Sequence, residues 1–336
     1  MPAPRVLFVK LSSLGDVIHH FPAVSDLARH RPDVEIEWAV EEAYAEVVAL
    51  HPGVKRTIPV NLRRLRKALL SPGAWGLLKD SRRALQAHAF DYIVDTQGLL
   101  KSAMVARMAR GVRFGLDRVS CREKGAARFY DVTFDVPWSL HAVDRNRRLV
   151  AEVFGFAIDP AIDYGLRIPS PAPEWAPVTP YVVGLHASSR ADKLWAGERW
   201  IALAAALAER NVTIVYPGGN EKERAMARRL ADASLNAVAA PAMSLTQAAA
   251  LIGQADAVVG VDTGLTHLAV ALARPTIGLY VATEPGRTGL AGGELAVNLG
   301  GPGQVPSVLA VMQALFGHPP TDAQPAAPEP ESAQTA

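Results

Sequence analysis

The chain has 336 residues, a length that suffices for about two domains of ~150 residues. Since 49% of the residues are hydrophobic and 20% are charged, the composition excludes a chain that is disordered throughout. Its single cysteine, Cys121, excludes an intramolecular disulfide framework and a zinc or iron–sulfur site built from cysteines. The net charge is only +2, but residues 1–168 carry 25 Lys and Arg against 19 Asp and Glu, and the remainder carries 10 against 14, so an anionic partner is expected at the first half.

In the first half of the chain, short apolar segments alternate with longer amphipathic ones. Strands are predicted at residues 6–9, 35–40, 57–60 and 92–95. Helices are predicted from the polar turn at 12–16 to about residue 30, after the second strand through residue 50, and at 75–87 and 99–110. This alternation is typical of a parallel sheet covered by helices on both faces.

A proline-rich stretch divides this alternation in two. Residues 168–180 contain five prolines and no periodic pattern, which predicts an interdomain linker. Beyond it, strands are predicted at 181–185, 213–216, 257–261 and 276–281, and helices at 198–209, 221–233, 245–252 and 263–272. The expected domains are residues 1–168 and 181–316, joined by a linker at 169–180 and followed at 317–336 by a tail whose Pro, Ala, Gln and Glu predict disorder.

The sequence therefore predicts an α/β protein of two Rossmann-like domains whose parallel sheets face a central cleft. In open parallel sheets, ligands bind at the carboxyl ends of the strands, where loops and helix N-termini gather. This rule selects the loops at 10–16, 95–101, 186–193, 216–223 and 261–267. No Gly-x-Gly-x-x-Gly follows the first strand, which disfavours a NAD-dependent dehydrogenase.

The first of these loops ends in Gly15 and Asp16. Asp16 stands at the predicted start of a helix, where a carboxylate that only caps the helix would contribute ~1 kcal/mol. A carboxylate at the carboxyl end of a strand, facing the cleft, could instead act as a general base. Position alone favours the cap, and both interpretations stay open.

The loop at 261–267 has the residues of an anion site. Asp262 and Thr263 can cap the next helix, and Gly264 lets a ligand approach its backbone. The exposed amides and the positive end of the helix dipole then suit a diphosphate. His267 lies four residues beyond Thr263, on the same helical face, and is either a ligand-binding residue or a structural histidine.

Two further loops give weaker signals. Ser188, Ser189 and Lys193 follow a predicted strand and would suit the oxygen atoms of a phosphate or a sugar, although the same residues also fit a polar surface loop. Glu223 lies in the first turn of a predicted helix, where it could hold ribose hydroxyls or only favour the helix dipole.

Taken together, these loops resemble those of the lipopolysaccharide heptosyltransferases, in particular the members that add the first heptose. The matching stretches are VKLSSLGDVIH at 9–19, EE at 41–42, RRLRK at 63–67, DTQGLLKS at 95–102, HAVDR at 141–145 and VDTGLTHL at 261–268. They come in the order of the family and cover roughly residues 5–300. The resemblance implies an inverting glycosyltransferase of the GT-B arrangement, whose donor is ADP-L-glycero-D-manno-heptose and whose acceptor is a Kdo residue of Kdo2–lipid A.

The resemblance also assigns roles to residues. The aspartate matching Asp16 is the proposed catalytic base of the family. The positions that match donor-binding residues are Ser188, Ser189, Lys193, Glu223, Asp262, Thr263, Gly264 and His267. Those that would meet the phosphates and carboxylates of the acceptor are Arg63, Arg64, Arg66, Lys67 and, further along, Lys101.

The remaining expectations concern location, cofactors and rival functions. The resemblance implies a cytoplasmic protein that acts at the cytoplasmic face of the inner membrane. No signal peptide, membrane-spanning run or amphipathic anchor helix is evident, so we expect peripheral, largely electrostatic contact. No cofactor or metal is expected, since no carboxylates are paired at metal-ligand spacing, and no nucleic-acid module is present. The alternatives are an enzyme that adds the second or third heptose, a sugar-nucleotide epimerase on the same scaffold, and a non-catalytic binder.

Overall fold

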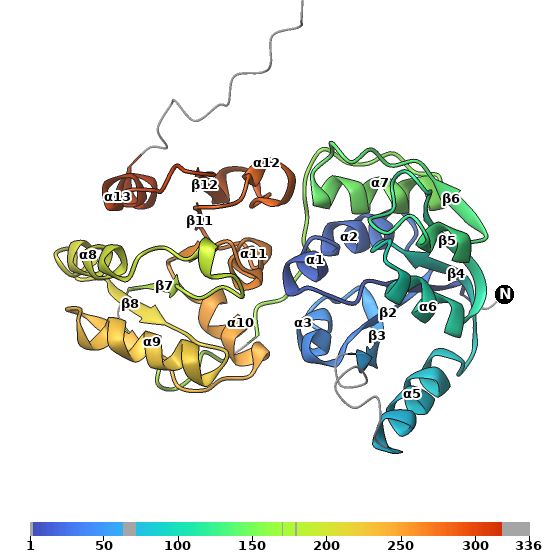
Figure 1. Ribbon diagram of the computed structural model, residues 1–336, viewed down its shortest axis with the longest axis horizontal. Helices are drawn as coiled ribbons and strands as arrows, with labels where there is room; N and C mark the ends of the chain where they lie inside the picture. Colours follow the sequence, from blue (N-terminus) through green and yellow to red (C-terminus); the bar gives the residue numbers. More distant parts are fainter. Residues whose placement is uncertain (1–2, 63–71, 170, 179, 318–336) are drawn as a thin grey trace, which may run out of the picture.

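A computed structural model of the chain, which describes residues 3–62, 72–169, 171–178 and 180–317, contains two parallel sheets, one in each half (Figure 1). In the first half the described strands are β1 (Arg5–Val9), β2 (Glu35–Glu41), β3 (Val54–Val60), β4 (Ala89–Asp95), β5 (Arg110–Leu116) and β6 (Val132–Phe134). The described α-helices there are α1 (Leu14–Ile18), α2 (Phe21–His30), α3 (Ala45–Val48), α5 (Pro72–Leu85), α6 (Leu100–Met108) and α7 (Ala142–Phe154).

The second half repeats this plan. Its described strands are β7 (Tyr181–Leu185), β8 (Thr213–Tyr216), β9 (Ala237–Ala239), β10 (Ala257–Val261), β11 (Thr276–Tyr280) and β12 (Ala296–Gly300). Its α-helices are α8 (Gly197–Ala208), α9 (Glu221–Asp232), α10 (Leu245–Gly253), α11 (Gly264–Ala271), α12 (Pro285–Thr288) and α13 (Val308–Phe316). None of the described helices is both long and apolar enough to cross a membrane.

Both sheets have the doubly wound strand order that creates a binding crevice. The orders are β3-β2-β1-β4-β5-β6 and β12-β11-β10-β7-β8-β9, with every pair parallel. The strand order reverses beside β1 in one sheet and beside β7 in the other, and ligands bind outside the carboxyl ends of strands at such points. The central strands are continuous apolar runs because helices cover both faces, as the fully buried residues of β1 from Val6 to Val9 show.

The two halves meet through helices that follow these central strands. The start of α1 packs on α11, and α3 packs on α10, so the carboxyl edges of the two sheets lie toward one another (Figure 1). The connection between the halves contacts both of them, because Arg167 N–H donates to the Leu50 carbonyl and the Tyr164 hydroxyl donates to the Ala291 carbonyl. Its described residues, from the end of α7 to the start of β7, form no helix or strand.

The predicted helix from the 12–16 turn to residue 30 is wrong in one respect, because it is two helices. α1 ends at Ile18 and α2 begins at Phe21. Pro22 lies in the first turn of α2, where its missing N–H costs nothing, whereas inside a continuous helix the ring would clash with the preceding turn. The break places His19 at the end of α1, against the second half. Residues 318–336 of the predicted tail at 317–336 and the basic run at 63–67 lie outside the described residues.

Candidate active site

A cavity of about 800 Å³ lies between the two halves. Most of its lining residues come from the loops after β1, β7, β8 and β10, which are four of the five loops that the strand-end rule selected. Asp16 from the first half lines it, and so do all eight second-half residues that the sequence singled out: Ser188, Ser189, Lys193, Glu223, Asp262, Thr263, Gly264 and His267. The structure therefore brings together residues that are separated by up to 251 positions, since Asp16 and His267 line one cavity.

Asp16 is held by the residue that caps its own helix. Ser13 is the N-cap of α1, and Asp16 is the third residue of the helix, so the interpretation of Asp16 as the N-cap is wrong. The Oδ2 atom of Asp16 accepts hydrogen bonds from Ser13 N–H at 2.8 Å and from Ser13 Oγ at 2.9 Å. These bonds fix the carboxylate at the wall of the cavity while leaving Oδ1 without a described partner there.

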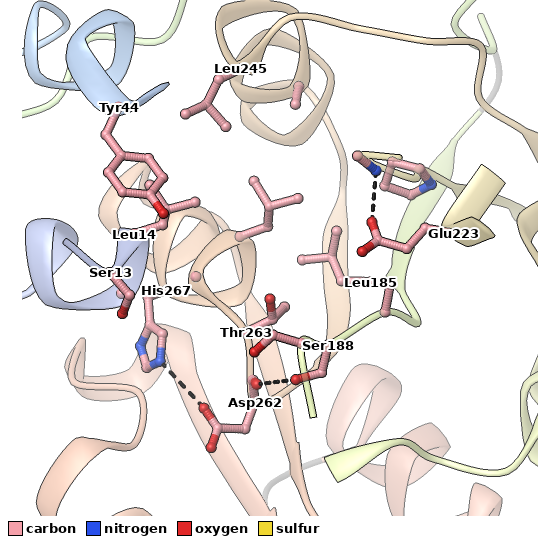
Figure 2. A pocket seen from close by; sticks show the side chains of 18 of the residues that line it. Ser13, Leu14, Tyr44, Leu185, Ser188, Glu223, Leu245, Asp262, Thr263 and His267 are labelled. Atoms are coloured by element: carbon pink, nitrogen blue, oxygen red, sulfur yellow. Dashed lines mark hydrogen bonds and ion pairs between the residues drawn. The ribbon is translucent and has the colours of Figure 1, made fainter. Parts of the chain in front are cut away.

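Asp262, from the second half, is the centre of a polar cluster at the cavity (Figure 2). Its Oδ2 atom accepts from Lys193 Nζ at 2.6 Å and from Thr283 Oγ1 at 2.7 Å, and its Oδ1 atom lies 4.0 Å from Nε2 of His267. Burial alone would raise the pKa of the Asp262 carboxyl, but its three neighbours outweigh burial and hold that pKa well below its usual value. The carboxylate thus stays ionised and orients a lysine and a histidine at the cavity.

The start of α11 presents backbone N–H groups to the same cavity. Thr263 is the N-cap by position, but its side chain makes no capping hydrogen bond, and Asp262 is engaged by Lys193. The expected side-chain cap is therefore wrong, and the Gly264 and Leu265 amides and the positive end of the helix dipole remain available for an anion, whereas the Thr266 N–H donates to the Thr263 carbonyl. Gly264 has a second role, because a Cβ there would lie 2.6 Å from the Leu14 Cβ of α1.

Glu223 closes the loop between β8 and α9. Its Oε2 atom accepts from Gly219 N–H at 2.8 Å and its Oε1 atom from Asn220 Nδ2 at 2.6 Å (Figure 2). Asn220 in turn caps α9 by accepting from the Glu223 N–H. On the neighbouring loop, Ser188 Oγ donates to the Asp262 carbonyl at 3.3 Å. Glu223 and Ser188 thus organise the backbone of the two loops that flank the Asp262 cluster.

The predicted acceptor residues lie outside this cavity or outside the described part of the chain. Lys101 does not line the cavity; its Nζ atom donates to Ser12 Oγ at 2.7 Å, one residue before the cap of α1. Arg63, Arg64, Arg66 and Lys67 belong to a segment that the structure does not describe. Among the described residues, no group of three or more His, Cys, Asp or Glu side chains is arranged to hold a metal ion.

Several residues of the cavity were missed by the sequence analysis. Thr283 follows β11, and its position after an apolar strand is a signal that the strand-end rule could have used. Tyr44, directly before α3, and Leu245, the first residue of α10, also line the cavity (Figure 2). His19 ends the matching stretch at 9–19, and no local pattern distinguishes it from its buried neighbour His20.

The comparisons with known proteins agree with this architecture. The model of glycosyltransferase family 9 (heptosyltransferase) matches residues 79–308. The chain is 43% identical over 301 residues to lipopolysaccharide heptosyltransferase 1 of Pseudomonas aeruginosa, with 88% of this chain and 83% of that protein covered. It is 40% identical over 293 residues to the protein of the same name from Escherichia coli, with 85% and 90% covered.

Solved heptosyltransferase structures resemble this chain in both fold and sequence. The E. coli heptosyltransferase WaaC with ADP superposes with a TM-score of 0.85 at 38% identity, covering 92% of this chain and 98% of that one. The same enzyme with ADP-2-deoxy-2-fluoro heptose gives a TM-score of 0.84. The two parallel sheets, the cavity between them and these relatives lead to one conclusion: the chain belongs to glycosyltransferase family 9, the heptosyltransferases, and is a GT-B-like glycosyltransferase.

Proposed function

We propose that this enzyme transfers L-glycero-D-manno-heptose from ADP-heptose to a Kdo residue of Kdo2–lipid A, with inversion at the anomeric carbon. The observation that carries the proposal is the cavity itself, which is lined by the Asp16 carboxylate of one half and the Lys193–Asp262 pair of the other. The names of the relatives and the ADP-heptose analogue bound by E. coli WaaC support the choice of donor and the place of the reaction in lipopolysaccharide biosynthesis.

In this proposal Asp16 acts as the general base for the acceptor hydroxyl. Its carboxylate takes the proton from the acceptor hydroxyl while that oxygen forms a bond to the anomeric carbon of heptose and the bond to the ADP phosphate breaks. One displacement of this kind inverts the anomeric configuration. Positioned general bases typically contribute ~10²–10⁴-fold to such a step.

The second half stabilises the leaving group. ADP gains negative charge as the glycosidic bond breaks, and Lys193 with the first-turn amides of α11 would meet that charge. Asp262 keeps the ammonium of Lys193 at the cavity before the donor arrives. We propose that no tightly held metal is required; transfer that survives chelation would agree with this, and a loss restored only by a divalent cation would contradict it.

The acceptor is proposed to approach along the basic first half. Arg63, Arg64, Arg66 and Lys67 would contact the phosphates and carboxylates of Kdo2–lipid A, and Lys101, which is bonded to Ser12, would lie at the acceptor side of Asp16. We further propose that the protein acts at the cytoplasmic face of the inner membrane by peripheral contact.

The choice of acceptor is tested by offering two of them. Purified enzyme is incubated with ADP-heptose and either Kdo2–lipid A or the same lipid already carrying one heptose, and product mass and ADP release are measured. We expect one heptose to be added to Kdo2–lipid A, and lipid A without Kdo to serve as the unreactive control. Transfer only to the heptose-bearing lipid would assign the enzyme to the second heptose, and ADP-heptose consumed without transfer would contradict the proposed reaction.

A further inference from the structure

Two buried histidines from opposite halves of the molecule contact each other at the wall of the cavity. His19 directly follows the last residue of α1, and His267 lies on α11. The two helices α1 and α11 pack together across the interface between the halves (Figure 1). The Nε2 atom of His19 is 3.2 Å from the Nδ1 atom of His267, and the rings meet edge to face with centroids 4.5 Å apart. Their exposed fractions are only 3% and 5%.

The position of the shared hydrogen follows from what surrounds His267. Its other ring nitrogen, Nε2, faces the Asp262 carboxylate at 4.0 Å, and a carboxylate offers only lone pairs. An N–H dipole at Nε2 is attracted to this carboxylate, whereas a lone pair there would be repelled. In a neutral imidazole, which carries a single hydrogen, an N–H at Nε2 of His267 leaves Nδ1 as the acceptor and Nε2–H of His19 as the donor.

The surroundings of His19 keep it in the neutral form that this arrangement needs. Burial lowers the pKa of His19 well below its usual value, and the nearby His267 and His141 act in the same direction. Lys10 also lowers this pKa, and Asp262 opposes the shift without overcoming it. The Nδ1 atom of His19 is buried and has no hydrogen-bond partner, so a doubly protonated ring would leave an unpaired N–H there.

The third histidine at this interface does not compete for the same hydrogen. His141 caps α7 by accepting at Nδ1 from the Val143 N–H, and its Nε2 lies 3.1 Å from the Gly289 carbonyl, to which it must donate. Its ring contacts that of His19 only edge to face, at 5.5 Å between centroids. Both nitrogens of His141 are therefore engaged, and the partner of His19 is His267.

We propose that His19 is a positioning residue for donor binding: by donating its Nε2–H to His267 across the interface, it fixes the His267 tautomer whose Nε2–H is directed to Asp262 and the cavity. This inference rests on the proposed function for its consequence, since an N–H rather than a lone pair then faces the place where the donor phosphates would lie. It also joins α1, which carries Asp16, to α11, which carries the anion site.

The first test is spectroscopic and needs no substrate. Protein labelled with ¹⁵N-histidine is studied by two-bond ¹H–¹⁵N correlation, which reports which ring nitrogen carries hydrogen, and the His267 signals are assigned by their absence in His267→Gln. We expect the wild type to show His267 with hydrogen on Nε2 and none on Nδ1. A wild-type His267 with its hydrogen on Nδ1, or a doubly protonated ring at neutral pH, would overturn the proposal.

The second test compares two substitutions of the donor. His19→Phe keeps an aromatic ring without a donor, and His19→Gln offers an amide N–H near the place of Nε2. We expect His19→Phe to mix the two His267 tautomers and to weaken ADP binding about tenfold by calorimetry, and His19→Gln to restore the tautomer and to bind ADP within about twofold of the wild type. The matched control is His20→Phe, which replaces a buried histidine next in sequence that does not line the cavity.

The outcomes separate this inference from the proposed function. An unchanged His267 tautomer and unchanged ADP affinity in a folded His19→Phe would overturn the inference while leaving heptose transfer intact. If His19→Phe does not fold, the wild-type spectrum and the His19→Gln variant decide the question by themselves. A wild type with the expected tautomer but no heptose transfer would count against the proposed function only.

Discussion

Among single residues, Lys10 is the clearest example of a charge placed at a cost. Its Nζ atom is buried after β1 and donates to the Thr96 carbonyl at 3.0 Å and to Asn146 Oδ1 at 3.1 Å. Burial lowers the pKa of Lys10 from 10.5 to about 8, although the nearby carboxylates of Asp16 and Asp95 oppose this shift. The unfolded chain therefore binds more protons between pH 8 and 10.5 than the folded one, so the destabilising contribution of Lys10 disappears as the pH rises through this window.

Substitution of Lys10 by Met removes this pH dependence. We compare the free energy of unfolding of the wild type with that of Lys10→Met. The difference is expected to be constant from about pH 6 to 7.5 and to rise between pH 8 and 10.5. The rise is a few kcal/mol at most, because each unit of pKa shift corresponds to about 1.4 kcal/mol. Urea unfolding at a series of pH values measures it, with the exposed Lys124→Met as the control. A difference that stays flat across pH 8–10.5 would show that Lys10 titrates normally.

At the scale of elements, the contact of α1 with α11 depends on the absence of a side chain at Gly264. A Cβ at this first residue of α11 would lie 2.6 Å from Cβ and 2.7 Å from Cγ of Leu14, distances that force the helices apart. Gly264→Ala is expected to destabilise the protein by ~1–3 kcal/mol through overpacking and to weaken ADP binding. Thermal unfolding and calorimetry measure the two effects.

The double variant Leu14→Ala with Gly264→Ala separates overpacking from any direct effect on the ligand. We expect it to recover much of the stability lost by Gly264→Ala, because the clashing atoms are removed. The matched control is Gly197→Ala at the first residue of α8, where the nearest atom would be Leu230 Cδ2 at 3.8 Å. Equal losses at Gly264 and Gly197 would contradict the packing argument.

These elements show what a sequence can and cannot predict. Most strands inside the two sheets were predicted because they are apolar runs between polar loops, and the strand-end rule then found most of the cavity. The break before Pro22 could have been found from the same sequence. Four of the described strands were not predicted. β6 and β9, of three residues each, have too few residues for a periodic signal, and in β5 and β12 glycine and polar residues interrupt the apolar run.

At the scale of the whole molecule, the contacts between halves were beyond the reach of local patterns. His19 and His267 are 248 residues apart, and Glu46 of α3 accepts from Thr246 N–H and Oγ1 at the start of α10, 200 residues away. Nothing in either segment alone indicates its partner. The contact between Ser13 and Asp16, by contrast, could have been predicted from the sequence, because Ser13 lies three residues before Asp16, the spacing of a capping box.

The uneven charge of the two halves leads to a prediction about membranes. We expect the protein to bind vesicles that contain anionic lipid and to be released as salt rises from about 0.1 M to about 1 M, where electrostatic attraction is screened within ~3 Å. Sedimentation with vesicles measures this, and neutral vesicles serve as the control. Replacing Arg64 and Arg66 with Glu should weaken binding more than Lys222→Glu in the second half does, and salt-independent binding would contradict peripheral electrostatic contact.

The most direct test of the whole account is the turnover of Asp16→Asn with ADP-heptose and Kdo2–lipid A. This change keeps the size of the side chain, and Asp144→Asn is the matched control because Asp144 is likewise the third residue of its helix and does not line the cavity. We expect Asp16→Asn to lower kcat at least ~100-fold while ADP affinity is retained, and Asp144→Asn to transfer heptose near the wild-type rate. Turnover by Asp16→Asn at the wild-type rate would contradict the role of Asp16 as the base.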